Sequence, residues 1–400
     1  MDDGGSCLKV SVLHEMAELE RMRSEWERLL GHSAGLHPSL TPTWLLTWWR
    51  VFGGPEAGRR LRTLVVHRGR ELVGMLPLLS RRHWYHRLVP LRRLELLASG
   101  ENREHEICSE YLGPIVASGQ EDEVVGAIVD QLAANRGTWE EIAFSALDGL
   151  SPAVQRLEPA FQARGFSCES TVASRCPYIA LPKRWEDYLL ALSSDDRYMV
   201  KRSLRDFERW AGKDSGIEVA RGHEDLQRGN AILRQLHEHR WQAGGKAGVF
   251  ASPVFRRFHG MLMPVLLDQG ELDLRWLHVR GEPVAVSYGI VNENRLYFYQ
   301  GGRATTVPKG VRPGIVLHLH AIRAAIEAGR LEYDFLGGDA RYKTQLATRT
   351  RPLAELRVTR LSLPEAARAA VAAGRRLLRT SEGRGVERGE KSLDRQPARH

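Results

Sequence analysis

A basic, glycine-rich loop separates an expected strand from an expected helix in the C-terminal half of the sequence. The stretch GGRATTVPKGVRPGIVLHLHAIRAA, residues 301–325, holds four glycines and two prolines and follows the run RLYFYQ. Glycine allows the backbone to approach a ligand closely, and the first turn of a helix presents unpaired N–H groups that bind anions. Pro313 suits the first helical position, while Lys309 and Arg312 add positive charge. The loop therefore either binds a pyrophosphate or is an ordinary strand-to-helix turn.

The loop does not follow either of the common nucleotide-binding patterns. It lacks the GxxxxGK[ST] sequence of a P-loop. A dinucleotide-binding fingerprint would need GxGxxG in a parallel unit, with an acid about 20 residues further on. The strands before this loop are expected as an antiparallel meander, so a different kind of phosphate site is indicated.

His237 stands in the segment HEHRW, where helical spacing places it on the same face as Trp241. Its unperturbed pKa near ~6.5 would suit a general base. His239 is two residues away and points in another direction on a helix, so a metal-binding pair is not expected. A hydrogen-bonded structural histidine is the alternative.

Asp334 alternates with the apolar residues Tyr333 and Phe335 on an expected strand. A carboxylate that faces inward has a perturbed pKa and can act as a base. It can equally be the partner of a buried arginine. Asp339 follows two glycines, and we expect it to cap the helix that begins at residue 340.

Two similar successions of elements occur along the chain. In the first half, residues 61–99 predict a β-meander, residues 121–137 a helix and residues 140–148 a strand. In the second half, helical segments precede a three-stranded meander at 272–302, which leads to the loop, its helix and a strand from residue 332. We therefore expect an α/β (α+β) fold of two tandem domains, each a mixed, mostly antiparallel sheet flanked by helices.

The length of 400 residues exceeds that of one ordinary core. We expect an N-terminal domain at 1–176, a C-terminal domain at 177–365, and a helix end with a disordered basic tail at 366–400. Residues 375–400 contain eight Lys or Arg and four Asp or Glu, so they contribute +4 to the net charge of +9. Because this excess lies outside any folded motif, nucleic acid is not an expected partner.

Composition argues against a membrane protein and against a metal site. No apolar run reaches the ~18 residues of a membrane span, and the start MDDGGSCLKV has no apolar signal region. We therefore expect a cytoplasmic protein without an integral membrane segment. Cys7, Cys108, Cys168 and Cys176 form no CxxC pair, so they are expected to be buried free thiols, with neither zinc nor disulfides. The oligomeric state is not indicated.

Residues 185–350 resemble the acetyltransferase domain of the GNAT-like family typified by the cellulose-biosynthesis protein CelD, which also resembles the FemAB peptidoglycan transferases. GNAT acyltransferases have the same order of elements: a β-meander, a glycine-rich loop at the start of a helix, and then a further strand. The tryptophan-rich helix after HPSLTP and the segment SEYLGPIV extend the resemblance over most of residues 1–360. The matching pieces are LHEHRWQAGGKAGVF (236–250), GEPVAVSYGIVNENRLYFYQGG (281–302), GVRPGIVLHLHAIRAAIEAG (310–329) and EYDFLGGDARYKTQLA (332–347).

The resemblance implies two GNAT-like halves and an acyl-CoA donor, in the first place acetyl-CoA. The pantetheine would follow the strand LYFYQGG, and the pyrophosphate would meet the backbone at the helix start. The usual GNAT loop reads Q/RxxGxG/A, whereas this chain has KGVRPGI. The implied cofactor-binding residues are Tyr299, Gln300, Lys309, Gly310, Val311, Arg312, Gly314 and Ile315.

The resemblance also places acyl-transfer chemistry on an amine acceptor. Tyr342 would protonate the leaving thiolate and Lys343 would hold charge of the acceptor or of CoA, unless the two form a surface helix start. His237 and Asp334 are the candidate bases. Arg240 and Trp241 are the candidate acceptor-binding residues, and the acceptor would be a small-molecule amine such as an amino sugar.

Two other functions remain open from the sequence. A FemAB-like transferase would take an aminoacyl group from charged tRNA, but it usually carries a long helical hairpin that this sequence lacks. A degenerate GNAT pair would act as a scaffold or binding protein in polysaccharide synthesis. Binding of CoA at residues 309–315 would distinguish the enzyme from the scaffold.

Overall fold

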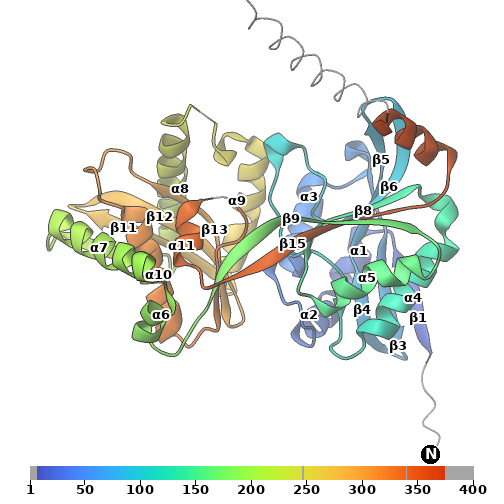
Figure 1. Cartoon of the computed structure of the whole chain (residues 1–400), viewed down its shortest axis with the longest axis horizontal. Helices are drawn as coiled ribbons and strands as arrows, with labels where there is room; N and C mark the ends of the chain where they lie inside the picture. The colour runs from blue at the N-terminus through green and yellow to red at the C-terminus, as the bar shows by residue number, and fades with distance from the viewer. Residues whose placement is uncertain (1–6, 246, 339, 374–400) are drawn as a thin grey trace, which may run out of the picture.

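The computed structural model describes residues 7–245, 247–338 and 340–373, which form two halves lying side by side (Figure 1). Two long strands, β9 (Ser167–Ala180) and β15 (Arg349–Thr359), run from one half to the other. The position expected to separate two domains, between residues 176 and 177, lies inside β9. The predicted cap at Asp339 lies outside the described residues, as does residue 374 onward of the region 366–400, where a helix end and a disordered tail were expected.

The N-terminal half contains eight strands and five α-helices among its described residues. Its strands are β1 (Leu8–Leu13), β2 (Arg59–Leu61), β3 (Thr63–Arg68), β4 (Glu71–Leu76), β5 (Leu78–Tyr85), β6 (Val89–Leu96), β7 (Ile115–Val116) and β8 (Glu141–Asp148). Its helices are α1 (Met16–Arg21), α2 (Arg23–Gly31), α3 (Pro42–Phe52), α4 (Glu121–Ala134) and α5 (Pro152–Gln162), with 3₁₀ turns η1 (Pro38–Leu40), η2 (Pro55–Ala57), η3 (Arg103–His105) and η4 (Arg136–Thr138).

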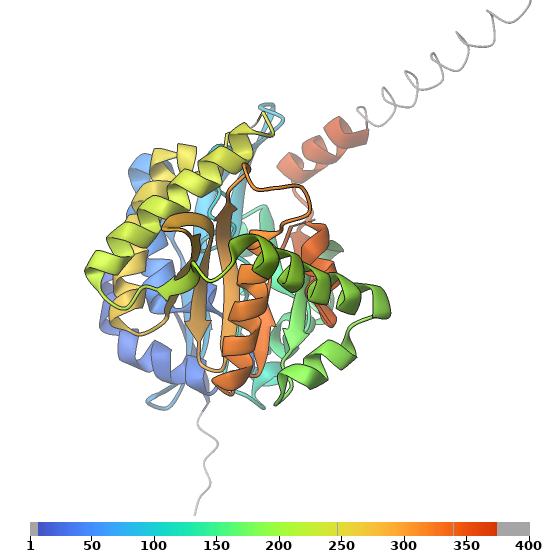
Figure 2. The same ribbon diagram turned by 90° about the vertical axis from the view of Figure 1, so that its left-hand side faces the viewer.

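The C-terminal half places helices on both faces of its strands (Figure 2). Its strands are β10 (Ser215–Val219), β11 (Leu272–Val279), β12 (Glu282–Asn292), β13 (Arg295–Arg303) and β14 (Glu332–Asp334). Its helices are α6 (Trp185–Ala191), α7 (Ser194–Ala211), α8 (His223–Gln242), α9 (Pro253–Asp268), α10 (Pro313–Glu327) and α11 (Arg341–Leu346), with the turn η5 (Val249–Ala251). Helices α8 and α9 share an apolar cluster with Leu274 and Trp276, whereas α7 and α10 pack against Leu277 and Val279.

Most strands of the described chain belong to one sheet that spans both halves. Its order is β10-β11-β12-β13-β14-β9-β15-β8-β6-β5-β2, and a second sheet has the order β1-β3-β4-β7. Strand β9 pairs with β14 at Tyr178–Ala180 and with β15 along Ser167–Tyr178, and β15 pairs in turn with β8. The two halves therefore share a continuous hydrogen-bonded ladder.

The two halves repeat the same order of elements, as the sequence indicated. Strands β3, β4 and β7 lead to α4 and β8, just as β11, β12 and β13 lead to α10 and β14. In the second half β14 runs parallel to β13, the strand before α10, and in the first half β8 pairs in parallel with β6 and bridges in parallel to Leu112, which precedes β7. The expected mixed α/β fold with predominantly antiparallel pairing is confirmed.

The tryptophan-rich helix α3 fixes the N-terminal half against α9. Thr41 caps α3 by accepting the Trp44 N–H at 3.2 Å, and Pro42 occupies the first helical position. Trp44 packs edge-on to Phe258 of α9 and to Tyr299 of β13. This buried aromatic contact brings the N-terminal half close to the middle of β13.

One sequence expectation about the core is wrong. Cys176 is buried and Cys168 is half-buried, but Cys7 and Cys108 are exposed. Cys7 immediately precedes β1, and Cys108 lies in the irregular segment between η3 and β7.

Candidate functional site

Strands β13 and β14 separate after a short parallel pairing. They pair at Arg295↔Glu332, Leu296↔Tyr333 and Tyr297↔Asp334, and β14 then ends while β13 continues to Arg303. On its other edge β13 pairs with β12. A β-bulge in this pair leaves Tyr299 of β13 without a partner residue on β12. The β14-side edge of β13 therefore offers its backbone groups to a ligand.

A pocket of about 360 Å³ lies between β13 and the start of α10. It collects side chains from β12, β13, the loop before α10, and the helices α8, α10 and α11. Its lining residues are Arg240, Val286, Ser287, Phe298, Gly301, Gly302, Arg303, Val311, Arg312, Gly314, Ile315, Leu317, His318 and Tyr342. Six residues predicted from the sequence thus meet around one pocket: Arg240, Val311, Arg312, Gly314, Ile315 and Tyr342.

The N-terminus of α10 faces this pocket with free donors. Pro313 is the first helical residue, and Arg312 at the N-cap makes no side-chain cap. The N–H groups of Gly314 and Ile315 have no hydrogen-bond partner among the described residues. Gly310 adopts φ +96°, a left-handed conformation that favours glycine and turns the loop into the helix. This end of α10 is therefore suited to bind an anion.

Positive charge surrounds the same helix end. Arg240, Arg303 and Arg312 line the pocket, and none of them forms an ion pair within the described chain. The first turn of α10 carries no acidic residue. Arg303 is a lining residue that the sequence analysis missed, and its position at the end of the strand RLYFYQGGR was the signal that could have found it.

The corresponding helix of the N-terminal half has the opposite character. The first turn of α4 contains Glu121, Asp122 and Glu123. These carboxylates stabilise the helix end themselves and repel phosphate. Of these two corresponding helix starts, only that of α10 has a first turn without acidic residues.

Tyr342 is the predicted catalytic residue that lies in the pocket. Its ring stacks on His318 with centroids 5.0 Å apart and an interplanar angle of 26°. Burial raises the pKa of Tyr342 to about 12, so the hydroxyl is protonated at neutral pH. No described residue accepts a hydrogen bond from this hydroxyl. It is thus available to donate a proton to a bound molecule.

Lys343, the neighbour of Tyr342, turns away from the pocket. Its Nζ donates to the carbonyl of Phe335 at 2.8 Å and to the carbonyl of Gly337. Burial lowers the pKa of this amine, while the charge of Glu110 raises it. Lys343 therefore ties α11 to the end of β14 and so holds Tyr342 in place.

Asp334 is fully buried and its oxygens are occupied. Oδ2 accepts from Arg351 Nη1 at 2.7 Å and from the Tyr111 hydroxyl at 2.9 Å, and Oδ1 accepts from the Leu336 N–H at 2.7 Å. Burial raises the pKa of Asp334, and the Arg351 guanidinium opposes this rise. Of the two sequence interpretations, this geometry favours the partner of a buried arginine.

His237 lies on α8 behind the pocket and not among its lining residues. Its Nε2 accepts from Trp241 Nε1 at 2.9 Å, and its ring is almost completely buried. Burial and the nearby Arg240 charge lower the pKa of His237 to about 4. A side chain added at Gly302 would meet the His237 backbone N at 2.6 Å, so α8 packs directly on β13 here. This contact helps position the strand.

The remaining predicted residues lie around the pocket without lining it. Lys309 and Gly310 are exposed in the loop. The Tyr299 side chain points toward α9 and the N-terminal half, where its hydroxyl donates to the Ile107 carbonyl and lies 3.1 Å from His259 Nε2. Gln300 is the next residue on β13, and Trp241 is half-buried below the Arg240 guanidinium, 5.8 Å from the ring centroid.

A carboxylate from the N-terminal half reaches the point where β13 and β14 separate. Glu110 accepts the Gly337 N–H at 2.7 Å through Oε2, and burial raises its pKa. It borders a small cavity with Tyr297 and Tyr299. Adjacent residues of a strand point to opposite faces, so this cavity and the pocket beside Phe298 lie on the two sides of β13. Glu110 belongs to the segment SEYLGPIV, and nothing in the sequence indicated its position.

Among the helices that the structure describes, none has the length and apolar character needed to cross a membrane.

Comparison with known proteins identifies part of the chain. Residues 194–344 match the family model described as "Acetyltransferase (GNAT) domain". A search of curated proteins found no match.

Three solved structures have a similar arrangement. FemX has a TM-score of 0.58 at 11% identity, over 84% of this chain and 95% of FemX. L-PGS from Bacillus licheniformis has a TM-score of 0.48 at 14% identity, over 86% of this chain and 94% of L-PGS. A tandem GNAT protein from the clavulanic acid biosynthesis pathway has a TM-score of 0.44 at 11% identity, over 88% of this chain and 100% of that protein. The likeness to FemX shows a shared fold, and the other two are too distant to carry an argument. The predicted GNAT-like fold of the C-terminal half is confirmed, and the N-terminal half repeats its order of elements.

Proposed function

Because the chain carries a GNAT acetyltransferase domain at residues 194–344 and is an acyltransferase, we propose that it transfers an acetyl group from acetyl-CoA to a small-molecule amine. The observation that carries this proposal is the uncapped N-terminus of α10, which faces a pocket beside the unpaired edge of β13. Anion-binding donors and a free strand edge together suit a molecule with a pyrophosphate and a chain of amides.

The residues present fit CoA. The Gly314 and Ile315 N–H groups and the Arg303 and Arg312 guanidiniums would hold the pyrophosphate. The backbone of β13 near Tyr299 and Gln300 would bind the pantetheine amides. When bound, the thioester supplies the activated acyl group.

Tyr342 and Glu110 provide the two proton transfers that the reaction needs. The amine nitrogen forms the new C–N bond while the C–S bond breaks. The proton of the amine passes to the Glu110 carboxylate, and the Tyr342 hydroxyl gives its proton to the departing sulfur. Burial raises the pKa of Glu110, which makes its carboxylate a stronger base, and raises the pKa of Tyr342 to about 12, which keeps its hydroxyl protonated at neutral pH.

Glu110 is preferred as the base over the two candidates from the sequence. The oxygens of Asp334 already accept three hydrogen bonds, and His237 Nε2 accepts from Trp241. Glu110 instead lies on the side of β13 that faces the N-terminal half. The acceptor amine would enter from that side, so the N-terminal half takes part in the site.

A calorimetric titration with acetyl-CoA tests the proposal. The variant Gly314→Glu places a carboxylate at the helix start, where an added Cβ lies no nearer than 3.7 Å to the neighbouring Arg303 side chain. Gly260→Glu on the exposed side of α9 is the matched control, because no atom lies within 4 Å of its Cβ position.

We expect the parent and Gly260→Glu to bind acetyl-CoA equally and Gly314→Glu to bind at least about tenfold more weakly, through charge repulsion at the helix end. A folded parent that binds no acetyl-CoA would overturn the proposal and favour the scaffold function. Activity in the cytoplasm, without an integral membrane segment, is part of the same proposal.

A further inference from the structure

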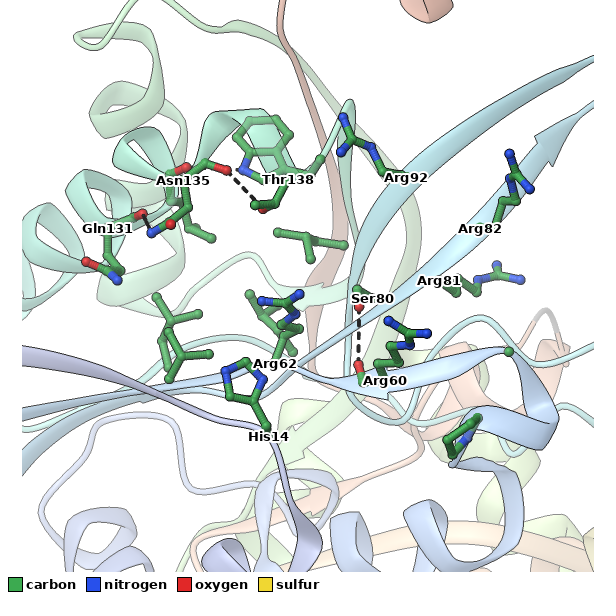
Figure 3. Close-up of a pocket in the computed structure, with 18 residues that line it drawn as sticks. His14, Arg60, Arg62, Ser80, Arg81, Arg82, Arg92, Gln131, Asn135 and Thr138 are labelled. Atoms are coloured by element: carbon green, nitrogen blue, oxygen red, sulfur yellow. Dashed lines mark hydrogen bonds between the residues drawn. The ribbon is translucent and has the colours of Figure 1, made fainter.

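A second pocket, of about 530 Å³, lies in the N-terminal half beside the β5–β6 hairpin. Figure 3 shows Arg60, Arg82 and Arg92 projecting from the strands on one side, with Gln131, Asn135 and Thr138 on the other. Arg62 lies between these sides. This pocket shares no residue with the pocket at α10. Its concentration of guanidinium groups is unexplained by acyl transfer.

The strand register places three of these arginines on one face of the sheet. Arg60 pairs with Ser80, and Ser80 and Arg82 are two residues apart on β5, so they share a face. Arg82 stands directly opposite Arg92 across the β5–β6 pair. Like charges in directly opposed positions destabilise a sheet. Glu140 balances the charge of Arg92, and a bound anion would balance that of Arg82.

The opposite face of the same hairpin shows how the fold neutralises arginines when they are structural. There Arg81 pairs with Glu95 at 2.7 Å, and Arg93 pairs with Glu141 at 2.5 Å and with Glu95 at 3.4 Å. On the pocket face, Arg92 has Glu140 as a partner.

Arg60, Arg62 and Arg82 have no carboxylate partner within the described part of the chain. The pocket face therefore holds positive charge that the protein itself does not balance.

The rest of the pocket suits the organic part of a ligand. Its floor includes the buried leucines Leu64 and Leu94. Asn135 donates its amide N–H to the Gln131 carbonyl at 2.9 Å, which orients the Asn135 side chain beside the pocket. Apolar area next to amide groups binds an organic moiety, whereas arginines bind phosphate through paired donors.

We propose that this arginine pocket binds a soluble organic diphosphate, with the diphosphate among Arg60, Arg62 and Arg82 and the organic part between the leucine floor and the amide wall. Several converging guanidiniums need a ligand with more than one negative charge. A volume of about 530 Å³ is in the range of small-molecule sites. This site is separate from the acyl-CoA pocket and goes beyond the proposed acyl transfer.

Calorimetric titration of the full chain with ADP and with inorganic pyrophosphate, each in the presence of saturating acetyl-CoA, tests the inference. The test variant is Arg60→Gln/Arg62→Gln/Arg82→Gln. The control variant is Arg221→Gln/Arg234→Gln/Arg257→Gln, which removes the same charge from exposed positions that form no ion pair within the described residues.

We expect the parent and the control to bind ADP more tightly than pyrophosphate, and the test variant to bind ADP at least about tenfold more weakly, as expected for the loss of charge-assisted hydrogen bonds. A folded parent that binds neither probe would overturn the inference. Equal weakening in both variants would also overturn it, because it would reflect net charge alone. Binding of pyrophosphate as tight as that of ADP would exclude the organic subsite.

Two further experiments test whether ADP binds in the acyl-CoA pocket instead, and whether the arginines bind a lipid headgroup. If ADP binding disappears when acetyl-CoA is present and returns without it, the probe occupies the acyl-CoA pocket and the inference fails. Sedimentation with vesicles of phosphatidylglycerol and phosphatidylcholine tests a membrane surface. Arginine-dependent binding to vesicles without binding of ADP would replace the soluble ligand with a lipid headgroup.

Discussion

Arg351 on β15 donates to Asp334 on β14 at 2.7 Å, in the buried seam where the two halves of the protein meet. The same guanidinium donates to Glu332 at 3.1 and 3.0 Å and lies 3.8 Å from Asp148 of the N-terminal half. His37 connects Asp148 to β13. Its Nε2 lies 3.0 Å from Asp148 Oδ2, and its Nδ1 lies 3.0 Å from the Tyr297 hydroxyl. The seam therefore depends on one cation that balances several buried carboxylates.

Replacing Arg351 with Met should destabilise the protein strongly. The variant leaves Asp334 and Glu332 buried without their cation, and removal of one partner from a buried pair costs about 3–5 kcal/mol. Urea denaturation followed by circular dichroism measures the loss. Arg349→Met on the same strand is the control, since Arg349 is exposed. Equal denaturation midpoints for the two variants would contradict the proposed importance of the seam.

Tyr342→Phe tests the proton donor. We expect kcat to fall by about 10²–10⁴-fold, the range for loss of a general acid, while the Kd for acetyl-CoA is unchanged. The free energy of unfolding should change little, because no described residue accepts a hydrogen bond from the Tyr342 hydroxyl. Tyr198→Phe, at an exposed tyrosine of α7, controls for the substitution itself. Unchanged kcat in Tyr342→Phe would refute the assignment.

Glu110→Gln tests the carboxylate contributed by the N-terminal half. Glutamine can still accept the Gly337 N–H, so the loop should keep its position. Because the negative charge is lost, we expect kcat/KM for the amine to fall by about 10²-fold or more without a change in acetyl-CoA binding. Glu106→Gln, an exposed neighbour in the same segment, should behave like the parent. If both variants lose activity equally, Glu110 has no particular role.

His237→Phe should affect stability more than catalysis. The variant removes the hydrogen bond from the half-buried Trp241 Nε1–H, and loss of such a bond costs about 0.5–1.5 kcal/mol. We expect kcat to stay within about threefold of the parent, since a group with a pKa near 4 does not titrate in the working range. Steady-state kinetics and urea denaturation give the two values. A hundredfold loss of kcat at parental stability would restore His237 as the base.

Glu101 should make stability depend on pH. Burial raises its pKa to about 7, against the hydrogen bond from Trp48 Nε1, so the folded chain keeps a proton that the unfolded chain loses near pH 4.5. The folded state binds more protons in this window, and this contribution to stability is lost as pH rises from about 4.5 to 7. Glu101→Gln removes that loss. Its stability relative to the parent should therefore increase by at most about 3 kcal/mol across the window, as urea midpoints at several pH values would show.

Parallel stability curves for the parent and Glu101→Gln would mean that Glu101 is ionised throughout. The buried histidines act in the opposite direction. Burial lowers the pKa of both His259 and His318 to about 3, so below pH 6.5 the unfolded chain binds protons that the folded chain does not. The stability of the folded state therefore decreases as pH falls from 6.5 toward 3. Subtraction of the parental curve removes this background from the Glu101 measurement.

The sequence by itself determined the order of elements and the position of the glycine-rich loop and helix start. The apolar periods of 272–302 and of the helix after Pro313, together with glycines in the loop, are local signals, and the structure has β11, β12, β13 and α10 in those places. Local patterns suffice here because strand, turn and helix start each depend on neighbours within a few residues. The pocket lining by Val311, Arg312, Gly314 and Ile315 follows from the same short segment.

Only the tertiary structure decided which titratable side chains meet. Asp334 received its cation from Arg351, Lys343 turned to the carbonyls at the end of β14, and Glu110 arrived from the other half of the chain. The unbalanced arginines of the second pocket depend on the register of β2, β5 and β6. A shift of one residue in such a register exchanges the two faces of a strand, and no pattern within a single segment fixes its partner. The chemistry of this protein is therefore assembled by contacts between residues far apart in its sequence.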